Sequence, residues 1–140
     1  MSAYKSEFLN TLANRGYIHQ CSDAAGLDTL AAKGGVTAYI GFDCTARSLH
    51  VGSLVQIMLL HWAQAHGQKT IALMGGGTTR VGDPSGRDES RKLLSIEDIE
   101  DNKRGIQEVF KKFLRFGEGP KDAIMVDNAE WLVKLNYLEM

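Results

Sequence analysis

The sequence predicts an α/β fold with a parallel β-sheet, and two observations support this. Apolar runs of strand length alternate with longer segments of helical periodicity, in the order strand, helix, strand, helix, strand over residues 36–140. Glycines stand where most of these segments are expected to begin or end. The βαβαβ order implies right-handed crossovers with helices packed against the sheet, as in Rossmann-like folds.

Length, composition and charge limit the classes of protein. With 140 residues, 44% apolar and 24% charged, the chain is long enough for one hydrophobic core. The net charge of −1, without a basic block, does not indicate a broad nucleic-acid-binding face. There is no signal-peptide pattern and no apolar run of transmembrane length, so we expect a cytoplasmic protein that binds no membrane. The cysteines and histidines lack metal-ligand spacing, so we expect no protein-bound metal.

Residues 1–35 are expected to form a helical segment ahead of the sheet. Apolar residues at helical spacing precede Gly16, which stands where a first helix would end. Ser22 or Asp23 is expected to cap a second helix that stops at residues 34–35.

The first half of the predicted sheet follows. Residues 36–42 are rich in β-formers and predict a buried strand. Ser48 is expected to cap a densely apolar helix that reaches about His66 and packs on the sheet. Residues 70–74 predict the second strand.

The second half is less regular. Residues 75–94 have no convincing periodicity, and we expect a loop, which at this length is usually functional. The stretch Ser95–Asp98 fits a capping box, and the helix that it begins is expected to end at Gly117. Residues 123–126 predict a third strand, and Asn128 is expected to cap a last helix. Because the chain stops within that helix, we expect a fragment.

An unusual polar stretch, YIGFDCTARSLHVGS (residues 39–53), crosses the carboxyl end of the first strand, where parallel sheets bind ligands. Helix N-termini offer unpaired N–H groups and a positive dipole end, which suit phosphate. His50 is suited to donate a hydrogen bond to a phosphate oxygen, and Gly52 to let another group approach the backbone. The alternative is that His50 is a capping or core residue. By pattern alone, Tyr39 would be a core tyrosine.

A second stretch, MGGGTTRVGDPSGRDESRK (residues 74–92), follows the second strand. It matches neither the dinucleotide fingerprint nor the P-loop. Arg87 and Arg91 are candidates for binding a polyphosphate, with solvated surface charge as the alternative. Residues 83–86 also form a good turn by their own chemistry.

Together the two stretches resemble the bacterial tyrosyl-tRNA synthetase family of class I aminoacyl-tRNA synthetases. YIGFDCTARSLHVGS is similar to Y-x-G-F-D-P-T-A-x-S-L-H-I-G-H, and LMGGGTTRVGDPSGR is similar to L-x-G-G-A-T-G-x-x-G-D-P-S-G-[KR]. Their order and spacing match, and the resemblance covers essentially the whole chain. The chain departs from the family at Cys44, which replaces a proline, and at Ser53, which replaces a histidine.

The resemblance implies a tyrosine–tRNA ligase. Tyrosine attacks the α-phosphate of ATP to give tyrosyl-adenylate and pyrophosphate, and the tyrosyl group is then transferred to tRNA(Tyr). No protein nucleophile is expected, so catalysis would rest on positioning and on stabilising phosphate charge. The implied partners are L-tyrosine, ATP with Mg²⁺, tRNA(Tyr) and a second copy of the chain in a homodimer.

The resemblance also assigns site residues. Tyr39 would hydrogen-bond the substrate phenol, and Asp83 with Thr78 would hold the α-ammonium group. For ATP and pyrophosphate the implied residues are Thr45, His50, Gly52, Ser53, Arg87 and Arg91; for tyrosine and the adenylate they are Tyr39, Gly41, Asp43, Thr78 and Asp83.

Other family signatures are missing: the K-M-S-K-S or K-F-G-K-[ST] loop, the G-S-D-Q-W-G-N stretch and the RNA-binding regions. We therefore expect residues 36–140 to be the first part of an incomplete Rossmann catalytic domain, with one wall of the active site. Two alternatives stay open. One is a stand-alone nucleotide-binding module without ligase activity. The other is a structural domain in which Asp43, His50 and Asp83 only cap and turn.

Overall fold

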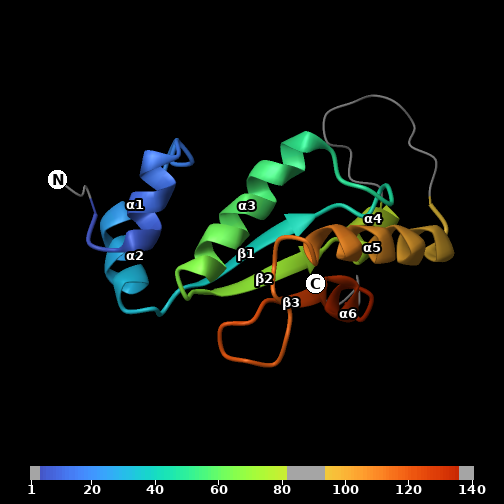
Figure 1. Cartoon of the computed structure of the whole chain (residues 1–140). Helices are drawn as coiled ribbons and strands as arrows, with labels where there is room; N and C mark the ends of the chain where they lie inside the picture. The colour runs from blue at the N-terminus through green and yellow to red at the C-terminus, as the bar shows by residue number, and fades with distance from the viewer. Residues whose placement is uncertain (1–3, 82–93, 136–140) are drawn as a thin grey trace.

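The structure is a computed structural model that describes residues 4–81 and 94–135 of the chain (Figure 1). Its centre is a parallel sheet of three strands in the order β1-β2-β3, which confirms the predicted α/β fold. Residues Tyr39 and Ile71 are register partners, as are Ile71 and Ile124. The strands are β1 (Thr37–Phe42), β2 (Lys69–Met74) and β3 (Ile124–Asp127).

Six helices are described, and they divide by position (Figure 1). Two long helices pack on the sheet, two pack together at the N-terminal end of the chain, and two short ones directly follow β2 and β3. The long pair is α3 (Val51–Ala65) and α5 (Ile96–Phe110), and the N-terminal pair is α1 (Glu7–Asn14) and α2 (Ala24–Ala32). The short helices are α4 (Gly76–Val81) after β2 and α6 (Ala129–Leu132) after β3.

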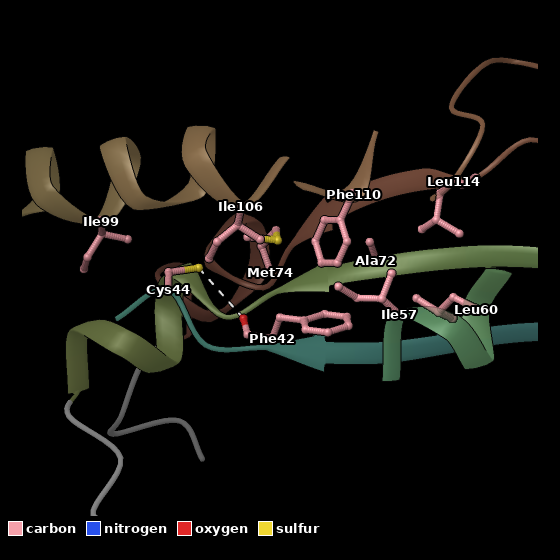
Figure 2. Packing of buried hydrophobic residues seen from close by; sticks show 11 residues of the cluster. Phe42, Cys44, Ile57, Leu60, Ala72, Met74, Ile99, Ile106, Phe110 and Leu114 are labelled. Carbon is pink, nitrogen blue, oxygen red and sulfur yellow. Dashed lines mark hydrogen bonds between the residues drawn. The ribbon is translucent and has the colours of Figure 1, made fainter. Parts of the chain in front are cut away.

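The main core lies between the strands and the helices α3 and α5. Side chains alternate along a strand, so Phe42 and its register partner Met74 point to the same side of the sheet. Figure 2 shows core side chains of α5 directed toward these strands. The rings of Phe42 and Phe110 pack edge to face with centroids 4.7 Å apart. The buried cluster is Phe42, Cys44, Ile57, Leu60, Ala72, Met74, Ile99, Ile106, Phe110, Leu114 and Ala123.

The prediction that β1 is a buried strand is wrong. Its pattern alternates, with Phe42 buried, Ile40 partly buried, and Tyr39 and Gly41 exposed. Because α3 and α5 both pack on the side of Phe42, the other face of this outer strand is open, and Tyr39 is 67% exposed there. The pattern-based interpretation of Tyr39 as a core residue is therefore also wrong.

The N-terminal helices form a second cluster against α3. Phe8, Leu9 and Ala31 pack with Ala63 of α3. Of the two candidates for the cap of α2, the structure selects Asp23, whose carboxylate accepts from Gly26 N–H at 2.8 Å. The domain boundary at residue 36 stays a prediction.

Two expected bounds around α5 need correction. Residues 76–81, expected within a loop, are helical, because acceptors from β3 pair the N–H groups at the start of α4, as described below. The end of α5 is Phe110 and not Gly117, since the chain turns there and brings Leu114 into the core. At its start, the Ser95–Asp98 capping box is confirmed, with reciprocal bonds of 3.1 and 3.2 Å.

The end of β3 carries the most connected side chain of the sheet. Asp127 Oδ1 accepts from Gly76 N–H at 3.1 Å and from Ala129 N–H at 2.9 Å, while Oδ2 lies 2.5 Å from Lys103 Nζ. Next to it, Asn128 stands at the cap position of α6 as predicted. Its side chain does not cap that helix, and Oδ1 instead accepts from Gly77 N–H at 2.7 Å. Residues 127–128 therefore hold the start of α4.

The Asp127–Lys103 pair is largely buried, with 13% and 20% of the two side chains exposed. Burial acts to raise the pKa of Asp127, but the hydrogen bonds from Lys103 and Ala129 outweigh it and lower the pKa below the ordinary 3.8. The carboxylate therefore stabilises the fold above the unfolded-state pKa. This contribution is lost as the pH falls through the lower folded-state pKa.

We expect Asp127→Asn to reduce the free energy of unfolding by about 1–2 kcal/mol at pH 7, because Lys103 loses its buried partner. The difference from the unsubstituted chain should begin to shrink as the pH falls below about 4, where the unfolded chain binds a proton at Asp127, and it should be smallest below the lower folded-state pKa. Urea denaturation at a series of pH values measures both effects.

Glu108→Gln is the matched control, since the Glu108–Lys111 pair is solvent-exposed. It should leave the urea midpoint unchanged at pH 7. An equal loss in both variants would show that the burial of Asp127 contributes nothing.

Candidate functional site

A cavity of about 720 Å³ opens beyond the carboxyl end of β1. Its wall consists of the last residues of β1, the connection from 43 to 50 and the first turns of α3. This is the edge where parallel sheets bind ligands. Six of the residues expected in the site line it: Gly41, Asp43, Thr45, His50, Gly52 and Ser53.

His50, and not Ser48, is the N-cap of α3, so the prediction for Ser48 is wrong. His50 has an extended backbone, and its Nδ1 accepts from Gly52 N–H at 3.0 Å. An accepting Nδ1 carries no proton, so the neutral ring holds its proton on Nε2. The imidazole is exposed. The cap thus fixes the tautomer in which Nε2 is the hydrogen-bond donor of a residue that lines the cavity.

Gly52 is required by the ring of His50. A Cβ at position 52 would lie 2.8 Å from Cε1 and 2.9 Å from Nδ1 of that ring. No such conflict exists at Gly41, where a Cβ would meet nothing within 4 Å. Ser53 also lines the cavity, but it is buried with 8% exposed, and its N–H donates to His50 O at 2.9 Å.

Helix α5 fixes the connection from 43 to 50 from the core side. Asn102 Nδ2 donates to Cys44 O at 2.9 Å, and Arg47 pairs with Asp101 at 2.9 Å. Burial, followed by the charge of Asp127, raises the pKa of the Cys44 thiol to about 11. The thiol is therefore protonated at neutral pH and is not a nucleophile.

Thr78 lies on α4, beside the cavity but not in its lining. Its hydroxyl donates to Gly75 O at 3.1 Å and accepts from Asn128 Nδ2 at 3.2 Å. A Cβ at Gly75 would lie 2.8 Å from Thr78 Oγ1 and 3.7 Å from Asp43 Cα, so these two residues flank the same glycine. One lone pair of the hydroxyl remains for a further donor.

Tyr39 lies on the same face of β1 as Gly41, which lines the cavity. Two residues along a strand span about 6.6 Å, so the backbone of Tyr39 lies one pleat away from Gly41 on the cavity wall. The structure therefore brings Tyr39 next to the cavity without including it in the lining. Asp83, Arg87 and Arg91 lie outside the described residues.

Several residues of this region were not expected from the sequence. Gln56 lines the cavity one turn after Gly52, a position that helical spacing from the motif would have indicated. Asp127 ends the third strand and Asn128 follows it, and the rule applied to the first two strands would have found them. Asn102 gave no such signal, since it sits within an amphipathic helix.

Residues 4–81 and 94–135 contain neither a metal-ligand cluster nor a membrane-spanning helix. Within these ranges, no group of three His, Cys, Asp or Glu side chains is placed to hold a metal ion. The helices described there are all too short or too polar to cross a membrane.

Comparison with known proteins decides the family. The model of the tRNA synthetases class I (W and Y) matches residues 31–140. The chain belongs to these class I tRNA synthetases. The tyrosine–tRNA ligases of Rhodopseudomonas palustris and Nitrobacter winogradskyi are each 66% identical to this synthetase chain over 140 residues. The matches cover 100% of this chain and 34% of each relative, so it spans about a third of the length of the curated relatives it matches.

Solved structures agree with this class I synthetase assignment. The C-terminally truncated mitochondrial tyrosyl-tRNA synthetase of Aspergillus nidulans matches with a TM-score of 0.77 at 30% identity, covering 94% of this chain and 40% of that one. The corresponding enzyme of Coccidioides posadasii matches with a TM-score of 0.70 at 30% identity, over 94% of this chain and 38% of that one. The resemblance to tyrosyl-tRNA synthetases is confirmed.

In this class I synthetase, Gly52→Ala should displace the His50 ring and break the hydrogen bond that keeps Nδ1 as the acceptor. Loss of the cap costs about 1 kcal/mol, and alanine regains up to about 1 kcal/mol in helix propensity, so stability should change little. The ring ¹⁵N chemical shifts should change, because Nδ1 loses its donor. Gly41→Ala is the control, and unchanged His50 shifts in both variants would contradict the role of Gly52.

Proposed function

We propose that this chain forms one wall of the active site of a tyrosine–tRNA ligase. The enzyme activates L-tyrosine with ATP, supplied with Mg²⁺, and transfers the tyrosyl group to tRNA(Tyr). The observation that carries the proposal is the cavity at the carboxyl end of β1, whose lining includes Asp43, Thr45 and His50. The names of the relatives, tyrosine–tRNA ligases at 66% identity, support it.

The phosphates of ATP would lie at the start of α3. His50 donates from Nε2, because Nδ1 is occupied by the Gly52 N–H. Thr45, exposed on the cavity wall, offers a hydroxyl donor to the same oxygens. Gly52 and Ser53 complete this ATP side, and Arg87 and Arg91 bind the departing pyrophosphate. Donors held in place before the reaction stabilise the charge that develops on the phosphates.

The α-ammonium group of tyrosine would bind at α4. An ammonium group only donates hydrogen bonds, so its partners must accept. The proton of Thr78 is directed to Gly75 O, and Asn128 occupies one lone pair, which leaves the hydroxyl oriented as an acceptor. Asp83 supplies the opposite charge in this proposal.

The side chain of the substrate would extend along the open face of β1. Tyr39 pairs with the substrate phenol there, while Gly41 and Asp43 line the adenylate pocket. A group that pairs with a hydroxyl disfavours the ring lacking one, because its own hydrogen bond is left unmet. Tyrosyl-tRNA synthetases are themselves an example of this rule.

The finer properties implied by the family belong to the same proposal. The ligase is a homodimer that works in the cytoplasm and binds no membrane. A stand-alone nucleotide-binding module without ligase activity is the competing function.

One experiment separates the two functions. In the Rhodopseudomonas palustris ligase, the matched segment is replaced by this chain, giving a hybrid that we name the swap enzyme. Tyrosine-dependent exchange of pyrophosphate into ATP, followed by charging of tRNA(Tyr), should occur at a rate near that of the parent ligase. A folded swap enzyme without exchange would contradict the ligase proposal, and ATP binding by the chain alone would then favour the module.

We expect His50→Ala in the swap enzyme to lower kcat for tyrosine activation about 100-fold, with KM for tyrosine changed less than about threefold. His50→Asn separates the two roles of this residue. Asparagine keeps an N-cap, so stability should be retained, whereas alanine costs about 1 kcal/mol. Activity should fall in both variants. Equal losses in kcat and in tyrosine affinity would contradict the phosphate role.

We expect Tyr39→Phe to reduce the preference for tyrosine over phenylalanine about tenfold. A loss of this size corresponds to roughly one hydrogen bond. The ratio of kcat/KM for the two amino acids in the swap enzyme measures it. Tyr17→Phe is the control, because Tyr17 packs in the N-terminal cluster. If the ratio of kcat/KM for tyrosine and phenylalanine were the same in Tyr39→Phe as in Tyr17→Phe, Tyr39 would not belong to the pocket.

A further inference from the structure

The backbone of Cys44 is bonded to two helices, through its N–H and through its carbonyl. Cys44 has 0% of its surface exposed, and its side chain belongs to the main core (Figure 2). Its N–H donates to Thr79 Oγ1 of α4 at 3.1 Å, and its carbonyl accepts from Asn102 Nδ2 of α5 at 2.9 Å. Both backbone polar groups of this buried residue are therefore satisfied by side chains of other elements.

The position of this peptide matters because of its neighbours. Asp43 and Thr45 flank Cys44, and both are exposed and line the cavity. The connection from 43 to 50 has no ladder or helix of its own to pair its backbone. A buried backbone N–H without a partner costs about 1–3 kcal/mol, so the Thr79 hydroxyl strongly favours one placement of this peptide.

The family motifs quoted above differ from this chain at both ends of the Cys44–Thr79 bond. They have proline where this chain has Cys44, and glycine where it has Thr79. Proline has no N–H to donate, and glycine has no hydroxyl to accept, so the motif pair lacks the bond altogether. This chain departs at both ends of one contact, and the two departures together create it.

We propose that Thr79 is a positioning residue, which through the Cys44 N–H places Asp43 and Thr45 on the cavity wall. The bond replaces the rigidity that a proline ring would give this connection. It also links the two motif stretches, since Thr79 follows Thr78 on α4. The proposal rests on the proposed function for what the cavity binds, but not for the bond itself.

The first test measures the bond without any activity. Amide hydrogen exchange of Cys44 N–H is followed by NMR in the chain and in two variants. Thr79→Val keeps the shape and removes the acceptor, so exchange should become about tenfold or more faster. Thr79→Ser keeps a hydroxyl and should stay within about threefold of the unsubstituted chain. Unchanged exchange in Thr79→Val, at equal global stability, overturns the proposal.

The second test is a double-mutant cycle in the swap enzyme. Thr79→Val should lower kcat for tyrosine activation about tenfold with KM for tyrosine nearly unchanged, and Thr79→Ser should restore it. In a Cys44→Pro background, where no N–H remains to be paired, Thr79→Val should cost less than about twofold. An equal loss in both backgrounds, or no loss in either, overturns the proposal.

The two tests distinguish a failure of the proposed function from a failure of the positioning role of Thr79. An inactive swap enzyme without substitutions contradicts the proposed function, and the exchange rate of Cys44 N–H then decides alone whether Thr79 holds this peptide. A protected Cys44 N–H that responds to Thr79→Val, combined with unchanged kcat in an active swap enzyme, overturns the positioning role.

Discussion

Buried backbone groups at the carboxyl edge of the sheet need partners, and the rest of the structure depends on this constraint. The strands end there, so ladder bonds no longer supply them. The N–H groups of Gly76 and Gly77 donate to the side chains of Asp127 and Asn128, which in both cases lie 51 residues further along the chain. The short helix α4 exists because β3 brings these acceptors beside β2.

The same constraint explains how the carboxyl edge of the sheet is held in place, although it consists of connecting segments between strands and helices. Side chains of the core-facing helix α5 reach it through Asn102, Lys103 and Asp101. Asn102 bonds the carbonyl of Cys44, Lys103 pairs with Asp127, and Asp101 pairs with Arg47. Burying one face of the sheet under α3 and α5 leaves the other open, and that asymmetry exposes Tyr39 next to the cavity wall.

His50 shows that a structural and a chemical role need not compete. The sequence left open whether it caps a helix or faces a ligand. The structure gives the cap to Nδ1, and capping by Nδ1 is what places the proton on Nε2. Gly52 belongs to the same unit, because any side chain there would meet the ring. The two residues of the motif thus work as one device at the start of α3.

The sequence by itself determined the order of the three strands and of the helices other than α4, and the Ser95–Asp98 cap, because these depend on local periodicity and short-range hydrogen bonds. It also indicated that Gly41, Asp43, Thr45, His50, Gly52 and Ser53 gather at one edge, and six such residues do line one cavity. Only the tertiary structure decided that β1 is open on one face, that Gly76–Val81 is helical, and that Thr79 and Asn102 hold Cys44. These features rest on partners far away in the chain, whose meeting is set by strand register and helix packing and leaves no local pattern.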